Sequence, residues 1–167
     1  ETIGITPPLL SDVTNAEYAA SLSADILLLN MFDVQHPVVQ ALPKVPEGET
    51  VRELKRLTGR AVGINLEPVQ PELAKGNDGT LWQMSPGRLA TAENACRAAD
   101  MGVDLIVLTG NPGNGVSNAA IEHALREISA AVGDRVILAA GKRHASGMIG
   151  EGGTRIMTVD DAQAGIA

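Results

Sequence analysis

Apolar residues gather into four runs along the chain, and each run ends in polar residues just before a loop rich in glycine or proline. The runs cover residues 25–30, 61–67, 104–109 and 135–142. Near-continuous runs of leucine and β-branched residues are typical of strands buried on both faces, as in parallel sheets covered by helices. Residues 1–6 have the pattern of a further, shortened strand. The pattern therefore predicts parallel strands whose polar tips share one edge of a sheet, where α/β proteins bind ligands.

Signals for helix starts and ends separate these runs. Thr14 and Glu17 have the spacing of a capping box, and Thr50 and Glu53 repeat it before a helix that Gly59 closes. Later helices are predicted to start at residues 85–86, 117 and 158–161. Helical spacing places two apolar stripes inward: Leu89, Ala92, Cys96 and Ala99, then Ile121, Leu125, Ile128 and Val132.

The connections differ in length at the two ends of the predicted strands. Helix-to-strand turns are tight, whereas the strand-to-helix loops at residues 32–49, 68–84 and 143–157 are long. Long loops on one side indicate a working face beyond the carboxyl ends of the strands. We therefore expect residues 1–167 to form a single domain, an incomplete parallel (β/α) barrel of TIM type with about five βα units. The alternative fold is an open, doubly wound parallel sheet.

Composition narrows the classes of partner and location. The net charge is -7, from 13 Lys and Arg against 20 Asp and Glu, which argues against a nucleic-acid footprint. Local field rather than total charge decides the binding of small anions, so these stay open. A single cysteine, Cys96, excludes an internal disulfide and fits a reducing compartment. With no membrane-length apolar run and no signal peptide, the sequence predicts a cytoplasmic protein without membrane contact.

The strand tips carry the first candidate site residues. Asp33 and Glu67 follow two successive strands, so their carboxylates are expected over one mouth, as ligands of a Mg²⁺ ion or as an acid/base pair. The alternative role for each is a helix cap or a loop salt bridge. Asn30 and Asn65 end apolar strands, where their amides are expected either to orient a substrate oxygen or to tie down loops.

Residues 109–115 form the most informative single motif. Its glycines allow close approach of a ligand to the backbone, and a helix predicted just after it offers free N–H groups to an anion. The same residues also suit a tight turn with positive φ angles. The substrate-binding residues predicted here are Thr109, Gly110, Asn111, Gly113, Asn114 and Gly115.

Lys142 and His144 leave the last apolar run. Lys142 is expected to neutralise an anionic substrate, or else to serve as a counter-ion of Glu67. His144 is a candidate for proton transfer near neutral pH, beside Glu67 and Lys142 as the reactive groups. His36 and His123 have no metal-ligand spacing and are expected to be structural or solvated.

Four segments together resemble an uncharacterised bacterial TIM-barrel family whose members are labelled phosphoenolpyruvate phosphonomutase-like and are distantly similar to the BtpA family. They are residues 25–33, 63–68, 108–115 and 141–144. The resemblance implies a barrel and a bacterial cytoplasmic protein. It implies no known reaction, because the family label itself rests on analogy. The sequence also departs from phosphonomutases and isocitrate lyases: their Lys-Lys-Cys-Gly-His segment has only a partial counterpart in residues 141–144, and their acidic metal-binding run is not recognisable.

These observations favour a lyase or isomerase that acts on a small phosphorylated or carboxylated metabolite, with Mg²⁺ as the cofactor that the carboxylates would hold. The alternative is a non-catalytic regulatory or assembly protein similar to BtpA that retains a ligand pocket. Exposed edges of an incomplete barrel also predict either homo-oligomers or a longer natural chain.

Overall fold

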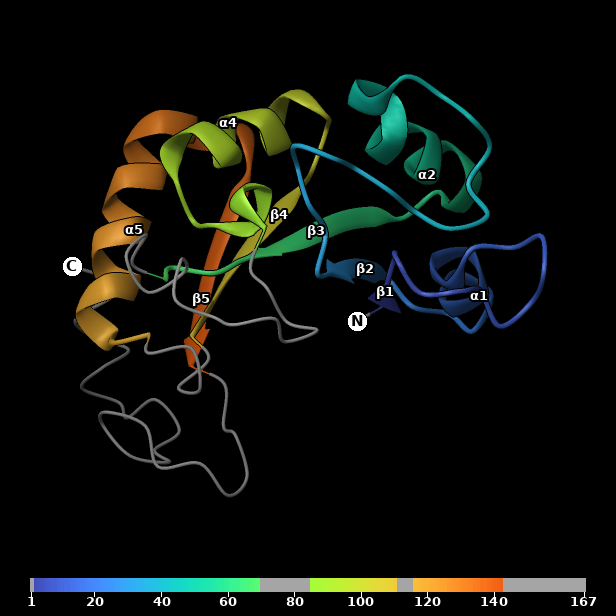
Figure 1. The fold of residues 1–167 in the computed structure, drawn as a ribbon, viewed down its shortest axis with the longest axis horizontal. Helices are drawn as coiled ribbons and strands as arrows, with labels where there is room; N and C mark the ends of the chain where they lie inside the picture. Colours follow the sequence, from blue (N-terminus) through green and yellow to red (C-terminus); the bar gives the residue numbers. More distant parts are fainter. Residues whose placement is uncertain (1, 70–84, 111–115, 143–167) are drawn as a thin grey trace.

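A computed structural model describes residues 2–69, 85–110 and 116–142 of the chain (Figure 1). The strands are β1 (Thr2–Ile3), β2 (Ile26–Asn30), β3 (Ala61–Leu66), β4 (Leu105–Gly110) and β5 (Ile137–Lys142). The α-helices are α1 (Asn15–Ser21), α2 (Thr50–Thr58), α4 (Ala92–Asp100) and α5 (Asn118–Val132). Short 3₁₀ helices are η1 (Glu47–Glu49), η2 (Pro86–Arg88) and η4 (Gly133–Arg135). The strand positions predicted from the four apolar runs are confirmed.

The strands form one parallel sheet in the order β1-β2-β3-β4-β5, so the predicted parallel α/β fold is confirmed. A doubly wound sheet reverses its strand order at a switch point. The described strands contain no reversal, and the doubly wound alternative is not their arrangement. Each strand lies beside the next one in the sequence, with a helix in the connection after β1, β2, β3 and β4.

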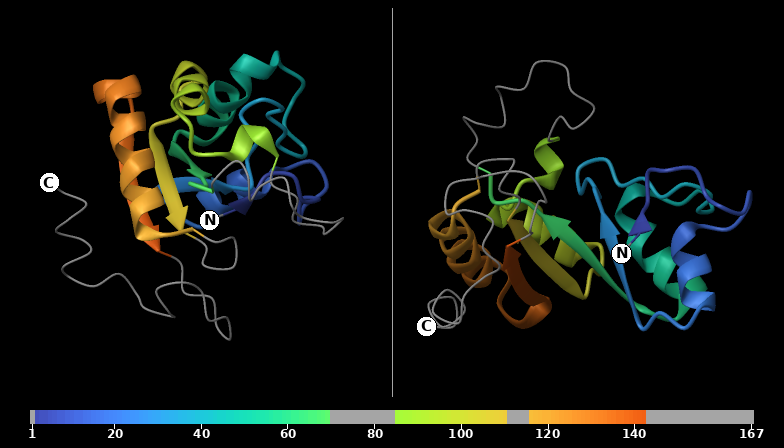
Figure 2. Two further views of the ribbon diagram at one scale, coloured as in Figure 1. Left: turned by 60° about the vertical axis from the view of Figure 1, so that its left-hand side comes forward. Right: turned by 90° about the horizontal axis from the view of Figure 1, so that it is seen from below.

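The helices follow one another in a row along one side of the curved sheet (Figure 2). Contacts join α1 to α2 and α4 to α5. Arg52 of α2 also donates a hydrogen bond to the carbonyl of Asp100 at the end of α4. This arrangement agrees with right-handed crossovers, which carry successive helices to the same side of a parallel sheet.

Alternate residues of the strands point at the helices and form the core. We call this side of the sheet the helix-covered face. Its central residues are at most 1% exposed: Leu27, Leu29, Val62, Ile64, Leu66, Ile106 and Leu108. With few aromatic residues in the chain, interlocking aliphatic side chains fill the space between the layers.

The ends of the first two helices test the predicted caps. The capping box of Thr14 and Glu17 is confirmed, with both reciprocal hydrogen bonds at 3.0 Å. Gly59 ends α2 with a φ of 63°, also as predicted. The second capping box is wrong. Thr50 is already inside α2, where its hydroxyl donates to the carbonyl of Pro37, and Glu53 pairs with Arg56.

The third predicted helix starts later than expected. Residues 85–86 lead into η2, and α4 begins only after Thr91, whose hydroxyl accepts from the backbone of Asn94. This shift rotates the buried stripe to Asn94, Ala95 and Ala98. Cys96 and Ala99 are only partly buried at the margin of this stripe. The prediction therefore placed the buried side of the helix at the wrong residues.

The start of α5 agrees with its sequence signal, since Ser117 caps it through the backbone of Ala120. Ile121, Ile128 and Val132 are buried as predicted. Ala124 completes the inward stripe, whereas Leu125 is partly buried beside it.

Candidate site at the carboxyl edge of the sheet

The side of the sheet opposite the helix-covered face, which we call the second face, carries predicted site residues. Asn30, Asn65 and Thr109 alternate with core residues of β2, β3 and β4 and therefore point to this side. Glu67 continues the same alternation one residue beyond β3. All four lie at or just past the carboxyl ends of their strands, so the predicted gathering of polar tips is present for them.

The rest of the second face is apolar. Leu28, Leu105 and Val107 are half-buried there, while Ile26 and Ile137 near the strand starts are 55% and 68% exposed. The face thus changes from aliphatic at the amino ends of the strands to polar at the carboxyl ends.

Asn30 and Asp33 shape the loop that follows β2. The amide oxygen of Asn30 accepts from the backbone of Met31, which has a φ of 59°. The carboxylate of Asp33 accepts from the backbone N–H groups of Gln35 and His36, at 2.8 and 3.1 Å. Both residues therefore support the loop. This is the structural alternative given for Asn30, whereas the bonds of Asp33 to backbone N–H groups are neither the helix cap nor the salt bridge considered for it.

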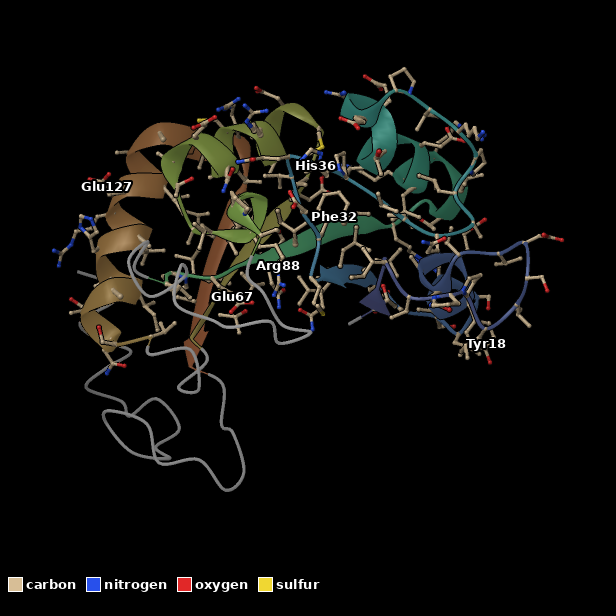
Figure 3. All side chains as sticks on the ribbon, in the orientation of Figure 1. Tyr18, Phe32, His36, Glu67, Arg88 and Glu127 are labelled. Atoms are coloured by element: carbon tan, nitrogen blue, oxygen red, sulfur yellow. The ribbon has the colours of Figure 1, made fainter. Side chains whose placement is uncertain are left out.

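Glu67 forms an ion pair with Arg88 of η2, and Oε1 of Glu67 lies 2.6 Å from Nη2 of Arg88 (Figure 3). Their side chains are only 13% and 11% exposed. The two backbones are also paired, because Glu67 donates to the carbonyl of Arg88 and accepts from Ala90, both at 2.9 Å. The counter-ion observed for Glu67 is thus Arg88, at a position that the sequence analysis did not select.

Asn94, which sequence reasoning also missed, joins the loop after β2 to η2. Its buried amide donates to the carbonyls of Pro86 and Leu89 at 2.8 and 2.9 Å. Its oxygen accepts from the side chain of Gln35 at 3.2 Å. No linear motif marks this role, because the partners come from separate segments.

Contact between the two loops continues at Gly87. The carbonyl of Gly87 accepts from the backbone of Val34 at 3.2 Å. A Cβ atom at Gly87 would lie 1.7 Å from Oδ1 of Asp33, so the loops can only pack this closely around glycine. The two strand-to-helix loops therefore form one hydrogen-bonded unit around Glu67 and Arg88.

Other predicted site residues lie partly or wholly beyond what the structure describes. Gly110 pairs with Lys142 across β4 and β5, which places this backbone at the same edge, but the Lys142 side chain is outside the described part. His36 and His123 are exposed. Five predicted site residues fall outside the described ranges: Asn111, Gly113, Asn114, Gly115 and His144.

The described residues do not assemble the predicted Mg²⁺ site. Within residues 2–69, 85–110 and 116–142, no group of three or more His, Cys, Asp or Glu side chains is placed to hold a metal. Asp33 is bonded to loop N–H groups and Glu67 to a guanidinium, whereas Mg²⁺ needs several oxygen ligands at close to octahedral geometry.

None of the helices in the described ranges is long and apolar enough to cross a membrane. A search of curated proteins gives no match. Residues 1–167 match the model of a family described as a domain of unknown function (DUF7916), and the chain belongs to that family.

Proposed function

We propose that this protein is a lyase or isomerase of (β/α) barrel type that acts on a small phosphorylated or carboxylated metabolite at the carboxyl edge of its sheet. The observation that carries the proposal is the gathering of Asn30, Asn65, Glu67 and Thr109 at that edge of the second face, with Arg88 paired to Glu67. Barrel enzymes bind their substrates at this end of the strands.

The barrel part of the proposal is supported by the strand order. Parallel strands that follow the sequence order with helices along one side are the repeating unit of a (β/α) barrel. The polar second face would then line the barrel interior at its mouth. A cytoplasmic location and the resemblance to phosphonomutase-like proteins stay predictions of the sequence.

The chemistry of the edge suits an anionic substrate. Asn65 and Thr109 offer hydrogen bonds, and Arg88 offers positive charge where an enolate-like oxyanion would develop. Lys142, at the end of β5, is proposed as a second cation. No step of this proposal passes through a metal, because the described residues do not fit one.

A second candidate function is a regulatory or assembly protein similar to BtpA that holds a ligand without turning it over. The specific observation in its favour is that the carboxylates of Asp33 and Glu67 are both bonded to protein partners. A carboxylate held in this way positions neighbouring groups more readily than it transfers protons.

The test combines binding with turnover. Thermal unfolding is measured with a panel of small phosphorylated and carboxylated metabolites, with and without Mg²⁺, and each stabilising compound is then followed for conversion by NMR. We expect Thr109→Val and Lys142→Ala to lose the stabilisation, while Lys44→Ala, in an exposed loop, keeps it. Stabilisation without turnover favours the second function. No stabilisation by any compound would reject both.

Self-association is part of the same proposal. Among the described strands, β5 has a neighbour on one side only, and an unpaired edge invites pairing with another chain. Light scattering on the purified protein should therefore give a mass above that of one chain, and a well-behaved monomer would argue against it.

A further inference from the structure

Arg88 is a buried cation whose hydrogen-bonding capacity is only partly used. The residue is 9% exposed, and its Nη2 group donates to Glu67. Its Nε and Nη1 groups donate to no residue in the described part of the chain. Neither group is fully enclosed by the protein, so solvent or a ligand can reach both. Arg88 thus keeps donors open to a ligand although most of its side chain is buried.

The backbone of Arg88 is held from both sides. Its N–H donates to the carbonyl of Ser85 at 3.0 Å, and its carbonyl accepts from Glu67. Asn94 donates to the carbonyls of Pro86, the first residue of η2, and of Leu89, the residue that follows it. Arg88 therefore has little freedom to leave its position, which is the property of a preorganised binding group.

The remaining donors have the geometry for an oxyanion. A guanidinium has two edges with two parallel N–H groups each, and both edges share Nη2. Of the guanidinium nitrogens of Arg88, Nη2 is the one that donates to Glu67, through one of its two hydrogens. One complete edge stays available, and a carboxylate or two phosphate oxygens match such an edge.

We infer that Arg88 binds the carboxylate or phosphate group of the ligand and that Glu67 is the residue that positions it. This inference rests on the proposed function and deepens it, because it names Arg88 as the group that makes the directed hydrogen bonds to the anion, with Lys142 as the second cation. It also changes the role of Glu67. A carboxylate 2.6 Å from a guanidinium serves to orient it and is a poor ligand for a cation, since Arg88 repels positive charge.

The pairing has a consequence for selectivity. Glu67 neutralises most of the charge of Arg88, so a spherical anion such as chloride gains little there. A planar carboxylate or a phosphate still gains two directed hydrogen bonds. The site should therefore distinguish oxyanions from chloride at equal ionic strength.

The experiment uses the full chain with inorganic phosphate and oxalate as probes and chloride as the reference. Binding is measured by calorimetry and by the shift in unfolding temperature of each variant relative to its own unliganded value. Arg88→Gln should weaken binding of the preferred probe about tenfold or more. Arg88→Lys retains the charge without the two-donor edge, so its affinity should lie between those of the wild-type protein and Arg88→Gln. Arg126→Gln is the matched control, because Arg126 lies on the α5 surface with a side chain 76% exposed.

Glu67→Gln separates positioning from folding. It should weaken the preferred oxyanion less than Arg88→Gln does and reduce its discrimination from chloride, a readout that a purely structural role would leave unchanged. If Arg88→Gln does not fold, Arg88→Lys decides the question alone.

The outcomes separate a failure of the Arg88 assignment from a failure of the proposed function. If the Arg88→Lys and Arg88→Gln variants both bind the probe as tightly as the wild-type protein does, the assignment of Arg88 is overturned while the proposed function stands. Loss in the Arg126→Gln control would also overturn it, because the effect would be general charge. If wild-type protein binds neither these probes nor any metabolite of the panel, the proposed function itself fails.

Discussion

The two faces of the sheet are built from the same strands but obey different rules. On the helix-covered face, the aliphatic side chains of β2, β3 and β4 are buried along the strands. On the second face, aliphatic residues near the strand starts give way to Asn65, Glu67 and Thr109 at the strand ends. On the helix-covered face, burial against the helices requires an apolar residue at each of these positions. On the second face, the residue type depends on how far along the strand the position lies.

The largest expected difference between the faces is in stability. Ile106→Ala on the helix-covered face removes fully buried atoms and should lower the free energy of unfolding by about 3 to 4 kcal/mol. Val107→Ala, one residue later on the half-buried second face, should cost about 1 kcal/mol. Urea denaturation measures both. Equal losses would mean that the second face is as tightly packed as the first.

A smaller effect is expected where the two loops meet at the carboxyl edge. Gly87→Ala would force its Cβ against Asp33 and the backbone of Gln35, so the loops must separate. The cost should be about 2 kcal/mol, in the range for overpacking. Gly48→Ala is the control, because nothing lies within 4 Å of its Cβ position. Thermal unfolding of the two variants should differ clearly, and similar midpoints would contradict the observed contact.

The buried amide of Asn94 should contribute somewhat less. Asn94→Ala removes two hydrogen bonds to η2 and leaves the carbonyls of Pro86 and Leu89 without that donor, at a cost of about 1 to 2 kcal/mol. Gln35→Ala removes only the 3.2 Å bond to Asn94 and should cost less. Hydrogen exchange around residues 85–90 should rise in the first variant; unchanged protection would show that α4 holds η2 by other contacts.

The smallest effect is expected on the solvent side of α2. The hydrogen bond from Arg56 holds the pKa of Glu53 below its ordinary value of 4.5. The folded state is therefore favoured above pH 4.5, and this contribution is lost as the pH falls through the lowered pKa. NMR titration should show the pKa of Glu53 returning toward 4.5 in Arg56→Gln. An unchanged titration would mean that the pair does not persist in solution.

Local signals predicted the parts of the fold that depend on neighbouring residues. The cap at Thr14, the end of α2 at Gly59 and the start of α5 after Ser117 all follow from contacts within a few residues. The signals at Thr50 and at residues 85–86 were wrong for a common reason. The hydroxyl of Thr50 reaches Pro37, and η2 pairs with Glu67, so long-range contacts replaced the local pattern.

In the candidate site, too, the sequence predicted only what depends on the local pattern. That Asn30, Asn65, Glu67 and Thr109 share an edge was predictable, because strand alternation and parallel pairing are periodic. The partners of their side chains were not. Asp33 accepts hydrogen bonds from its own loop, and Glu67 pairs with Arg88 across a gap of 21 residues, a partner that the sequence did not indicate.

The sequence by itself determined a parallel α/β sheet, the order of its elements and the edge at which polar groups collect, because hydrophobic periodicity and turn residues act over short stretches of chain. Only the tertiary structure decided which charges meet, since Arg88 and Asn94 acquire their roles from segments that folding brings together. Pairing of buried polar groups is a requirement on three-dimensional neighbours, and linear spacing carries no record of it.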